Sequence, residues 1–276
     1  MTTFTSLETG TVEYGPDYLY RSASVPDVAG GILFFTWTRI KDPGPAPWSI
    51  GNLNTLNIFA SNWYMQGIVG NGSNTNYNAN SMLFCDRGSG SEYVGDFSYY
   101  DAACTEEAHK DWVWVAWKLI MSGSAIVLKQ WLKFGTAGPV IPAGTTEYTL
   151  ADWRTTVLEG FNGWSTVEAN AWNPGPITEI QIGTGEGYFT KSGVLEMGSD
   201  PTLGELEALA VGTAPNTSAW ADWPMDWVAG APRTIDQSGN GEDLSIPAGG
   251  VLFAGPDLIF AGTTTPSTNM FMGANF

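Results

Sequence analysis

The sequence is poor in basic residues, and its charged residues are few in total. Its 276 residues hold 11 Lys and Arg against 28 Asp and Glu, which gives a formal net charge of −17. Such a surface repels nucleic-acid phosphates and anionic lipid headgroups, so neither is expected as a partner. Charged residues make up 14% of the chain and hydrophobic residues 43%, a balance that excludes an intrinsically disordered protein.

Cysteine and histidine are also scarce. Cys85 and Cys104 are too few for a disulfide framework in a chain of this length, and two buried thiols are the simpler interpretation of them. Whether they pair stays open. The single histidine, His109, and the lack of any C-x-x-C spacing exclude a zinc site built from these residues.

Long apolar runs are missing as well. No stretch reaches the roughly 18 apolar residues that a membrane-spanning helix needs, so membrane insertion is not expected. The first residues, MTTFTSLE, carry neither the basic nor the apolar part of a secretory signal peptide. We therefore expect a protein that is made in the cytosol.

The sequence is rich in strand patterns. Residues 31–40, 112–121 and 125–134 combine β-branched and aromatic residues, and the Ser-Gly-Ser between the last two predicts a hairpin. Residues 53–60, 63–69 and 177–183 are predicted as further strands. The tryptophans inside these runs are expected to fill the space between two sheets: Trp37, Trp112, Trp114 and Trp117.

One helix is predicted near residues 201–210. Asp200 is the expected N-cap and Pro201 the first helical residue, while the leucines at 203, 206 and 209 form one apolar face. Gly212 is expected to end it. The whole chain is predicted to be one all-β sandwich domain over 1–276, with residues 1–15 and 262–276 as extended arms or attachment segments.

Three segments in order resemble one family of β-sandwich domains. Residues 112–117 (WVWVAW), the turn and residues 125–135 are similar to the paired central strands of laminin-G-like domains. Residues 178–182 (TEIQI) resemble the late strand of that family. Residues 205–209 (ELEAL) resemble the end of the short helix that follows it.

A second signature points to the wider superfamily. Residues 220–226 (WADWPMD) and 236–244 (DQSGNGEDL) resemble the W-P-L-D … D-x-S-G-N-G-N-D-L pattern of concanavalin-A-like lectin and glucanase sandwiches from bacteria and their phages. Here the second element follows the helix, whereas in relatives it often opens the domain. The resemblance implies a jelly roll of two antiparallel sheets, a fold that hosts lectins, hydrolases, lyases and structural modules.

Catalytic motifs of this superfamily are missing. Glucanases on this fold resemble each other in an E-x-D-x-x-E strand, whose carboxylates suit a retaining mechanism, and no such motif occurs here. Residues 188–194 resemble part of a polysaccharide-lyase strand. The Q-[IV]-H strand that should accompany it is absent, because Gln181-Ile182 is followed by Gly183. We therefore expect no enzyme.

Binding is better supported. Residues 44–85 contain no Asp, Glu, Lys or Arg but nine Asn, together with several aromatic residues. Amides and aromatic rings suit a neutral glycan, and aromatic residues are equally typical of a protein interface. An Asn-rich turn is the plainer interpretation of residues 71–76. The predicted glycan- or partner-binding residues are Trp48, Asn62, Trp63, Tyr64, Asn76, Tyr77 and Trp223.

No cofactor is expected, although calcium is conceivable. Asp236, Asn240, Glu242 and Asp243 surround a Gly-Asn turn and could offer oxygen ligands. A turn with surface acidic residues explains the same four residues without a cation.

These observations predict a non-catalytic protein with a lectin-like fold, working on the surface of a virion as a phage head fibre, spike, decoration or tail-associated adhesin. Virion proteins act outside the cell without a secretion signal. Expected partners are a glycan or receptor of the host surface, other virion proteins and further copies of the chain. The alternatives are a glycan-cleaving hydrolase or lyase on the same fold, and a secreted lectin.

Overall fold

The structure is a computed structural model, and it describes residues 2–9, 18–22, 31–40, 49–50, 54–60, 63–69, 72–73, 81–86, 93–98, 112–122, 125–134, 154–158, 177–183 and 187–260. Within them lie antiparallel strands and one helix, so the all-β class predicted from the sequence is confirmed. The strands are β1 (Thr2–Thr9), β2 (Leu19–Arg21), β3 (Ile32–Ile40), β4 (Ser49–Ile50), β5 (Asn54–Ala60), β6 (Trp63–Val69), β7 (Gly72–Ser73), β8 (Ser81–Asp86), β9 (Tyr93–Ser98), β10 (Val113–Ser122), β11 (Ala125–Phe134), β12 (Arg154–Leu158), β13 (Ile177–Ile182), β14 (Gly187–Glu196), β15 (Ala221–Trp223), β16 (Asp226–Val228), β17 (Ala231–Arg233) and β18 (Phe253–Phe260).

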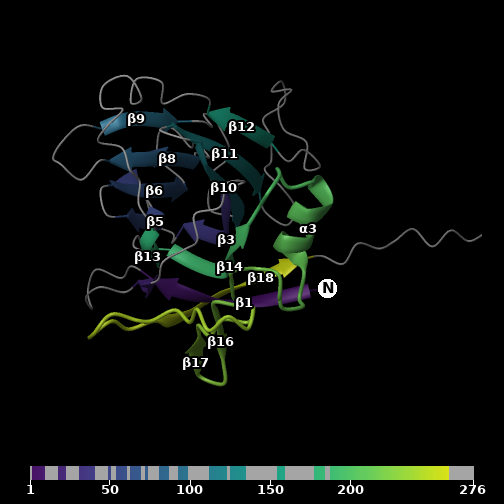
Figure 1. Cartoon of the computed structure of the whole chain (residues 1–276). Helices are drawn as coiled ribbons and strands as arrows, with labels where there is room; N and C mark the ends of the chain where they lie inside the picture. Colours follow the sequence, from purple (N-terminus) through teal and green to yellow (C-terminus); the bar gives the residue numbers. More distant parts are fainter. Residues whose placement is uncertain are drawn as a thin grey trace, which may run out of the picture.

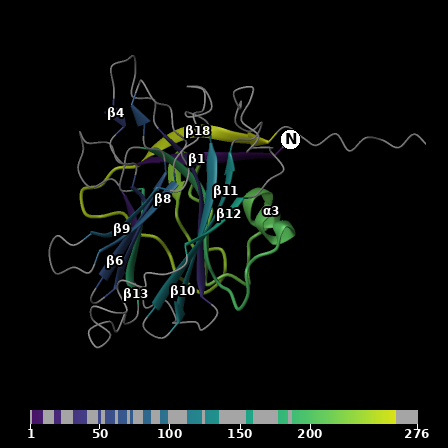
Figure 2. The same ribbon diagram turned by 90° about the horizontal axis from the view of Figure 1, so that it is seen from above.

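Two sheets and the helix form three layers. The larger sheet has eight strands in the order β12-β11-β10-β3-β14-β1-β18, with β15 also paired to β14, and the smaller has the order β2-β13-β5-β6-β8-β9. The helix, α3 (Leu203–Val211), lies on the far side of the larger sheet from the smaller one (Figures 1 and 2). The predicted hairpin is confirmed, since Ser122 pairs with Ala125.

Alternation along the central strands divides the side chains between two apolar layers. Leu33, Phe35 and Trp37 of β3 face the helix, where the cluster includes Leu206 and Ala210. The Trp37 indole donates to the Ala210 carbonyl over 2.8 Å and so ties sheet to helix. The residues between them on β3 share the opposite face, toward the smaller sheet. Burial of these rings removes large apolar areas from water and supplies most of the driving force for the fold.

Strand β14 divides one of its edges between two partners. Its first half pairs with β1, as Leu7 with Phe189, and its second half pairs with β15, as Ser192 with Trp223. A bulge separates the halves, and Lys191 within it has φ +46°, a left-handed conformation that is costly for a residue with a Cβ. The bulge therefore places Lys191 where β14 changes neighbours.

The first strand corrects one prediction. The sequence predicts an extended arm or attachment segment over residues 1–15, but residues 2–9 of it form β1, which lies inside the larger sheet between β14 and β18. Leu7 is fully buried there, because apolar residues of β1 complete the sandwich. Residues 262–276, the other predicted arm, lie outside the described residues.

The helix confirms the predicted segment but not the predicted cap. Thr202 is the N-cap, and a capping box joins it reciprocally to Glu205. Asp200 instead accepts a hydrogen bond from Lys118, whose side chain is buried beneath it. Gly212 ends the helix as predicted, although its φ of −62° needs no glycine. A Cβ at this position would lie 2.4 Å from the Ala208 carbonyl oxygen, so only glycine fits here without a clash.

The capping box makes a prediction. Replacing Thr202 by Ala removes the side-chain acceptor of the Glu205 N–H, so we expect a loss of about 1 kcal/mol in the free energy of unfolding. Urea denaturation measures it. Thr202→Ser, which keeps the hydroxyl, is the control and should stay close to the wild type; an equal loss in both variants would contradict the cap assignment.

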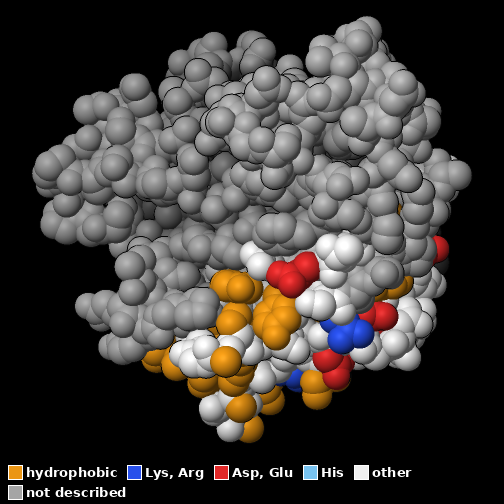
Figure 3. All heavy atoms as spheres, turned by 60° about the vertical axis from the view of Figure 1, so that its left-hand side comes forward, with side chains coloured by type: hydrophobic (Ala, Val, Ile, Leu, Met, Phe, Trp, Pro, Cys, Tyr) orange, Lys and Arg blue, Asp and Glu red, His pale blue; other side chains and the backbone are white. Residues whose placement is uncertain are grey.

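Apolar side chains are exposed toward the end of the described chain. Five large hydrophobic residues of the described part are more than a third exposed: Val228, Ile235, Val251, Phe253 and Ile259. Figure 3 shows hydrophobic side chains gathered at the lower end of one face. Exposed apolar surface of this kind is typical of an interaction site.

Candidate functional site

The outward face of the smaller sheet carries a band of amide and aromatic residues. Ile180 and Ile182 of β13 are buried, whereas Glu179 and Gln181, which alternate with them, are partly exposed. Because side chains alternate along a strand, the residues in register with Glu179 and Gln181 belong to the outward face. The register therefore shows which residues of the neighbouring strands share it.

Two rows cross β13, β5 and β6 on this face. Gln181 pairs with Asn57, which pairs with Gln66, so three amide residues stand in one row. In the next row Glu179 pairs with Phe59, which pairs with Tyr64. We call these six residues the amide–aromatic band. Directly paired residues of neighbouring strands lie roughly 5 Å apart, so the six positions form one compact group in the sheet.

Hydrogen bonds hold the β13 end of the band in place. Gln181 Nε2 donates to Glu179 Oε1 over 2.6 Å, and Ser22 Oγ donates to Glu179 Oε2 over 3.1 Å. Both oxygens of the Glu179 carboxylate thus have a donor. This fixes the orientation of the amide beside it.

The structure separates two predicted binding residues. Tyr64 is a member of the amide–aromatic band, whereas Trp63 pairs with Ala60, which in turn pairs with Ile177, and so occupies a different row. Trp48, Asn62, Asn76 and Tyr77 lie outside the described residues. Sequence reasoning did not select Asn57, Phe59, Gln66, Glu179 or Gln181, although they alternate with apolar residues along predicted strands.

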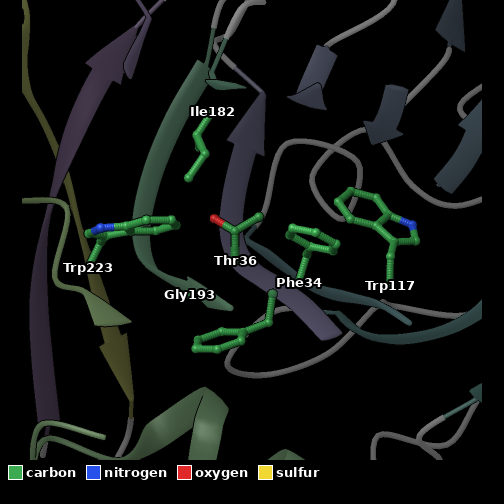
Figure 4. Close-up of a pocket in the computed structure, with 7 residues that line it drawn as sticks. Phe34, Thr36, Trp117, Ile182, Gly193 and Trp223 are labelled. Atoms are coloured by element: carbon green, nitrogen blue, oxygen red, sulfur yellow. The ribbon is translucent and has the colours of Figure 1, made fainter. Parts of the chain in front are cut away.

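Trp223 is removed from the predicted binding residues. It is 1% exposed, and its indole donates to the Glu242 carbonyl over 2.6 Å. Figure 4 shows its ring directed into the interior, toward Thr36 and Ile182. The cavity between these side chains has a volume of about 10 Å³, enough for about one water. A ring enclosed in this way cannot stack on a ligand.

The four residues considered for calcium organise a loop. Asp236 Oδ1 accepts from the N–H groups of Asp222 and Ser238, and its Oδ2 accepts from the Ser238 hydroxyl and the Glu242 N–H. The other three side chains also have protein partners: Asp243 accepts from the Asp236 N–H, Glu242 from Arg21, and Asn240 donates to two carbonyls. No group of three or more His, Cys, Asp or Glu within the described residues could hold a metal ion.

These hydrogen bonds change the acidity of Asp236. Its burial raises the pKa of the carboxyl group, but the four hydrogen bonds together lower the pKa below its usual value. Asp236 therefore acts as an ionised centre that fixes the loop to β15. The hydrogen bond from the Asp222 backbone N–H to the Asp236 carboxylate also holds Asp222 in place beside a cleft.

This cleft lies between the larger sheet and the end of α3. Its volume is about 530 Å³, in the range of ligand sites. One wall is apolar and mainly aliphatic, formed by Leu195, Met197, Leu209 and Pro215. The charged residues of the described lining are Lys191, Glu205 and Asp222. We call it the α3 cleft.

Lys191 and Asp222 are each bound to backbone groups. The Lys191 ammonium donates to the Gly212 carbonyl and lies 5.2 Å from the centre of the Phe4 ring. Asp222 Oδ2 accepts from the Asn216 N–H over 2.7 Å. Burial lowers the pKa of Lys191, while the negative charge of Asp222 acts in the opposite direction. The cleft thus offers a donor and an acceptor beside an apolar wall.

Comparison with known proteins gives no family for the chain. No protein-family model matches it, and no curated protein is similar enough to be a match. Among the described helical residues, none belongs to a helix long and apolar enough to cross a membrane.

Proposed function

We propose that the protein is a non-catalytic binding module with a concanavalin-A-like, laminin-G-like jelly roll, which works on the surface of a phage virion. It binds a neutral glycan of the host surface through the amide–aromatic band, and another virion protein through a separate face. The jelly-roll assignment and the virion setting rest on the resemblance of the sequence segments.

The observation that carries the glycan part is the register of β13, β5 and β6. It unites the amide residues Gln181, Asn57 and Gln66 on one face, with Phe59 and Tyr64 beside them. Amides both donate and accept hydrogen bonds, as sugar hydroxyls do, and aromatic rings cover the apolar face of a sugar ring. The uncharged span at 44–85 supplies β5, β6 and most of β8, so the strands around the band bring few charges to it.

The exposed apolar residues support the second contact. Val228, Ile235, Val251, Phe253 and Ile259 belong to β16, to β18 and to the segments beside β17 and β18, all outside the smaller sheet. A virion protein must attach to its particle and contact the host at once. Two separate surfaces allow both contacts.

A glycan array tests the proposal. We expect the wild type to bind one or more neutral glycans, and Gln66→Ala and Tyr64→Ala each to weaken that binding about tenfold, equivalent to about 1.4 kcal/mol. Gln237→Ala is the matched control, because Gln237 follows β17 outside the smaller sheet. Absence of any hit, or equal binding by all variants, would overturn the glycan part.

Enzyme assays test the non-catalytic part. The protein incubated with mixed polysaccharides should release no reducing sugar and produce no unsaturated product. Turnover that a single Asp or Glu substitution abolishes would contradict the proposal and favour a hydrolase or lyase.

A further inference from the structure

The α3 cleft is separate from the amide–aromatic band, and its residues are suited to a ligand of a different chemical class. The aromatic residue that lines it, Phe35, is 3% exposed, so it offers little flat surface for a sugar ring. The exposed lining is mainly aliphatic. A partner for this cleft must bring apolar side chains.

The polar groups of the cleft suit a peptide backbone. The Lys191 ammonium has three N–H donors, of which one goes to the Gly212 carbonyl, and Asp222 Oδ1 has no donor among the described residues. A peptide unit brings one carbonyl acceptor and one N–H donor, which match this pair. The carboxylates of Asp222 and Glu205 in the lining, together with the net charge of −17, disfavour an acidic peptide.

One segment of the chain has the required composition. Residues 261–276, AGTTTPSTNMFMGANF, contain no charged side chain and bring three consecutive large apolar residues at 270–272. They lie outside the described residues. Their side chains carry no charge that the carboxylates of the cleft would repel.

The segment also starts beside the cleft. The last described residue, Phe260, has its ring centre 6.0 Å from that of Phe4. Phe4 in turn lies under the Lys191 ammonium. The ten residues from 261 to 270 can span up to about 33 Å when extended, which is ample to reach the cleft of the same chain or of a neighbour.

We propose that residues 261–276 bind in the α3 cleft, with Met270, Phe271 and Met272 against the aliphatic wall and their backbone between Lys191 and Asp222. In the same chain this contact covers the cleft. Between chains, it links copies through exchanged segments without extending either sheet. This interaction does not depend on glycan binding.

Photo-crosslinking in the full-length chain tests the contact. The probe is Phe271→p-benzoylphenylalanine, at a position that follows the last described strand. Irradiation should crosslink the new side chain to residues within 191–222, and mass spectrometry identifies the crosslinked residues. A crosslinked product that migrates as one chain on a denaturing gel shows binding within the chain, and one that migrates as two shows exchange. Crosslinks that avoid 191–222 altogether would overturn the proposal, and so would no crosslink at all.

Blocking the cleft provides the matched comparison. Ala208 is exposed on α3 and lines the cleft, whereas Gly204 is exposed on the same helix outside it. Ala208→Glu should lower the crosslink yield at least fivefold, because it adds bulk and charge to the cleft. Gly204→Glu adds the same charge and should leave the yield unchanged. Equal yields in both variants, with melting temperatures showing both folded, would overturn the proposal.

Discussion

Asp236→Asn should cost about 3 kcal/mol in the free energy of unfolding, the largest effect that we expect from a change of charge alone. Asp236 is 8% exposed, and its two oxygens accept four hydrogen bonds from Asp222, Ser238 and Glu242. An asparagine amide has one oxygen, so its NH₂ group would face N–H or O–H donors. Denaturant titration at pH 7 measures the loss. Asp257→Asn, an exposed position on β18, is the control and should change little.

The effect should also depend on pH. Because the pKa of Asp236 is lower in the folded protein than in the unfolded chain, folding favours the carboxylate. Its contribution is complete above the ordinary aspartate pKa of about 3.9, and it is lost as the pH falls through the folded-state value. The stability difference between wild type and Asp236→Asn should therefore shrink below about pH 4. A difference that is constant from pH 7 to pH 3 would contradict the role of the charge.

Gly193→Ala should be destabilising by about 3 kcal/mol, because no space exists for a side chain there. A Cβ would lie 2.5 Å from Phe35 Cζ and 2.7 Å from the Ala221 carbonyl oxygen. The second atom is backbone in the paired strand β15, so relief requires opening the ladder between β14 and β15. Thermal or urea denaturation measures the loss.

Gly204→Ala is the matched control for this substitution. Gly204 lies within α3, and nothing stands within 4 Å of the position of a Cβ. Alanine favours the helix there by about 1 kcal/mol, so this variant should be more stable than the wild type. Losses of similar size in both variants would contradict the packing explanation for Gly193.

Much of the fold follows from local patterns in the sequence. The runs at 31–40, 112–121 and 125–134 form β3, β10 and β11 nearly as predicted, because long apolar runs that alternate or contain β-branched residues specify strands. The spacing of its leucines and the position of Gly212 predict the helix. The predicted N-cap is wrong by two residues, since Asp200 and Thr202 are both good caps; the capping box with Glu205 selects Thr202, while Lys118 binds Asp200.

The candidate sites depend on pairings that a sequence does not display. Asn57, Gln66 and Gln181 stand in one row only because β13 and β6 both pair with β5, although more than a hundred residues separate Gln66 from Gln181. Trp223 looked available in a Trp/Pro segment, but β15 adds to β14 and buries it. The α3 cleft joins Lys191 in a bulge to Asp222, and no local pattern predicts a bulge of this kind.

The position of β1 affects the order in which the protein can fold during its synthesis. Its residues pair with Phe189 on one side and, through Thr2 and Phe260, with the far end of the described chain on the other. β1, the first of the described strands, can therefore complete its hydrogen bonds only after about 250 further residues have been made. Because pairings between strands so distant in the sequence form slowly, we expect the larger sheet to be completed late in folding.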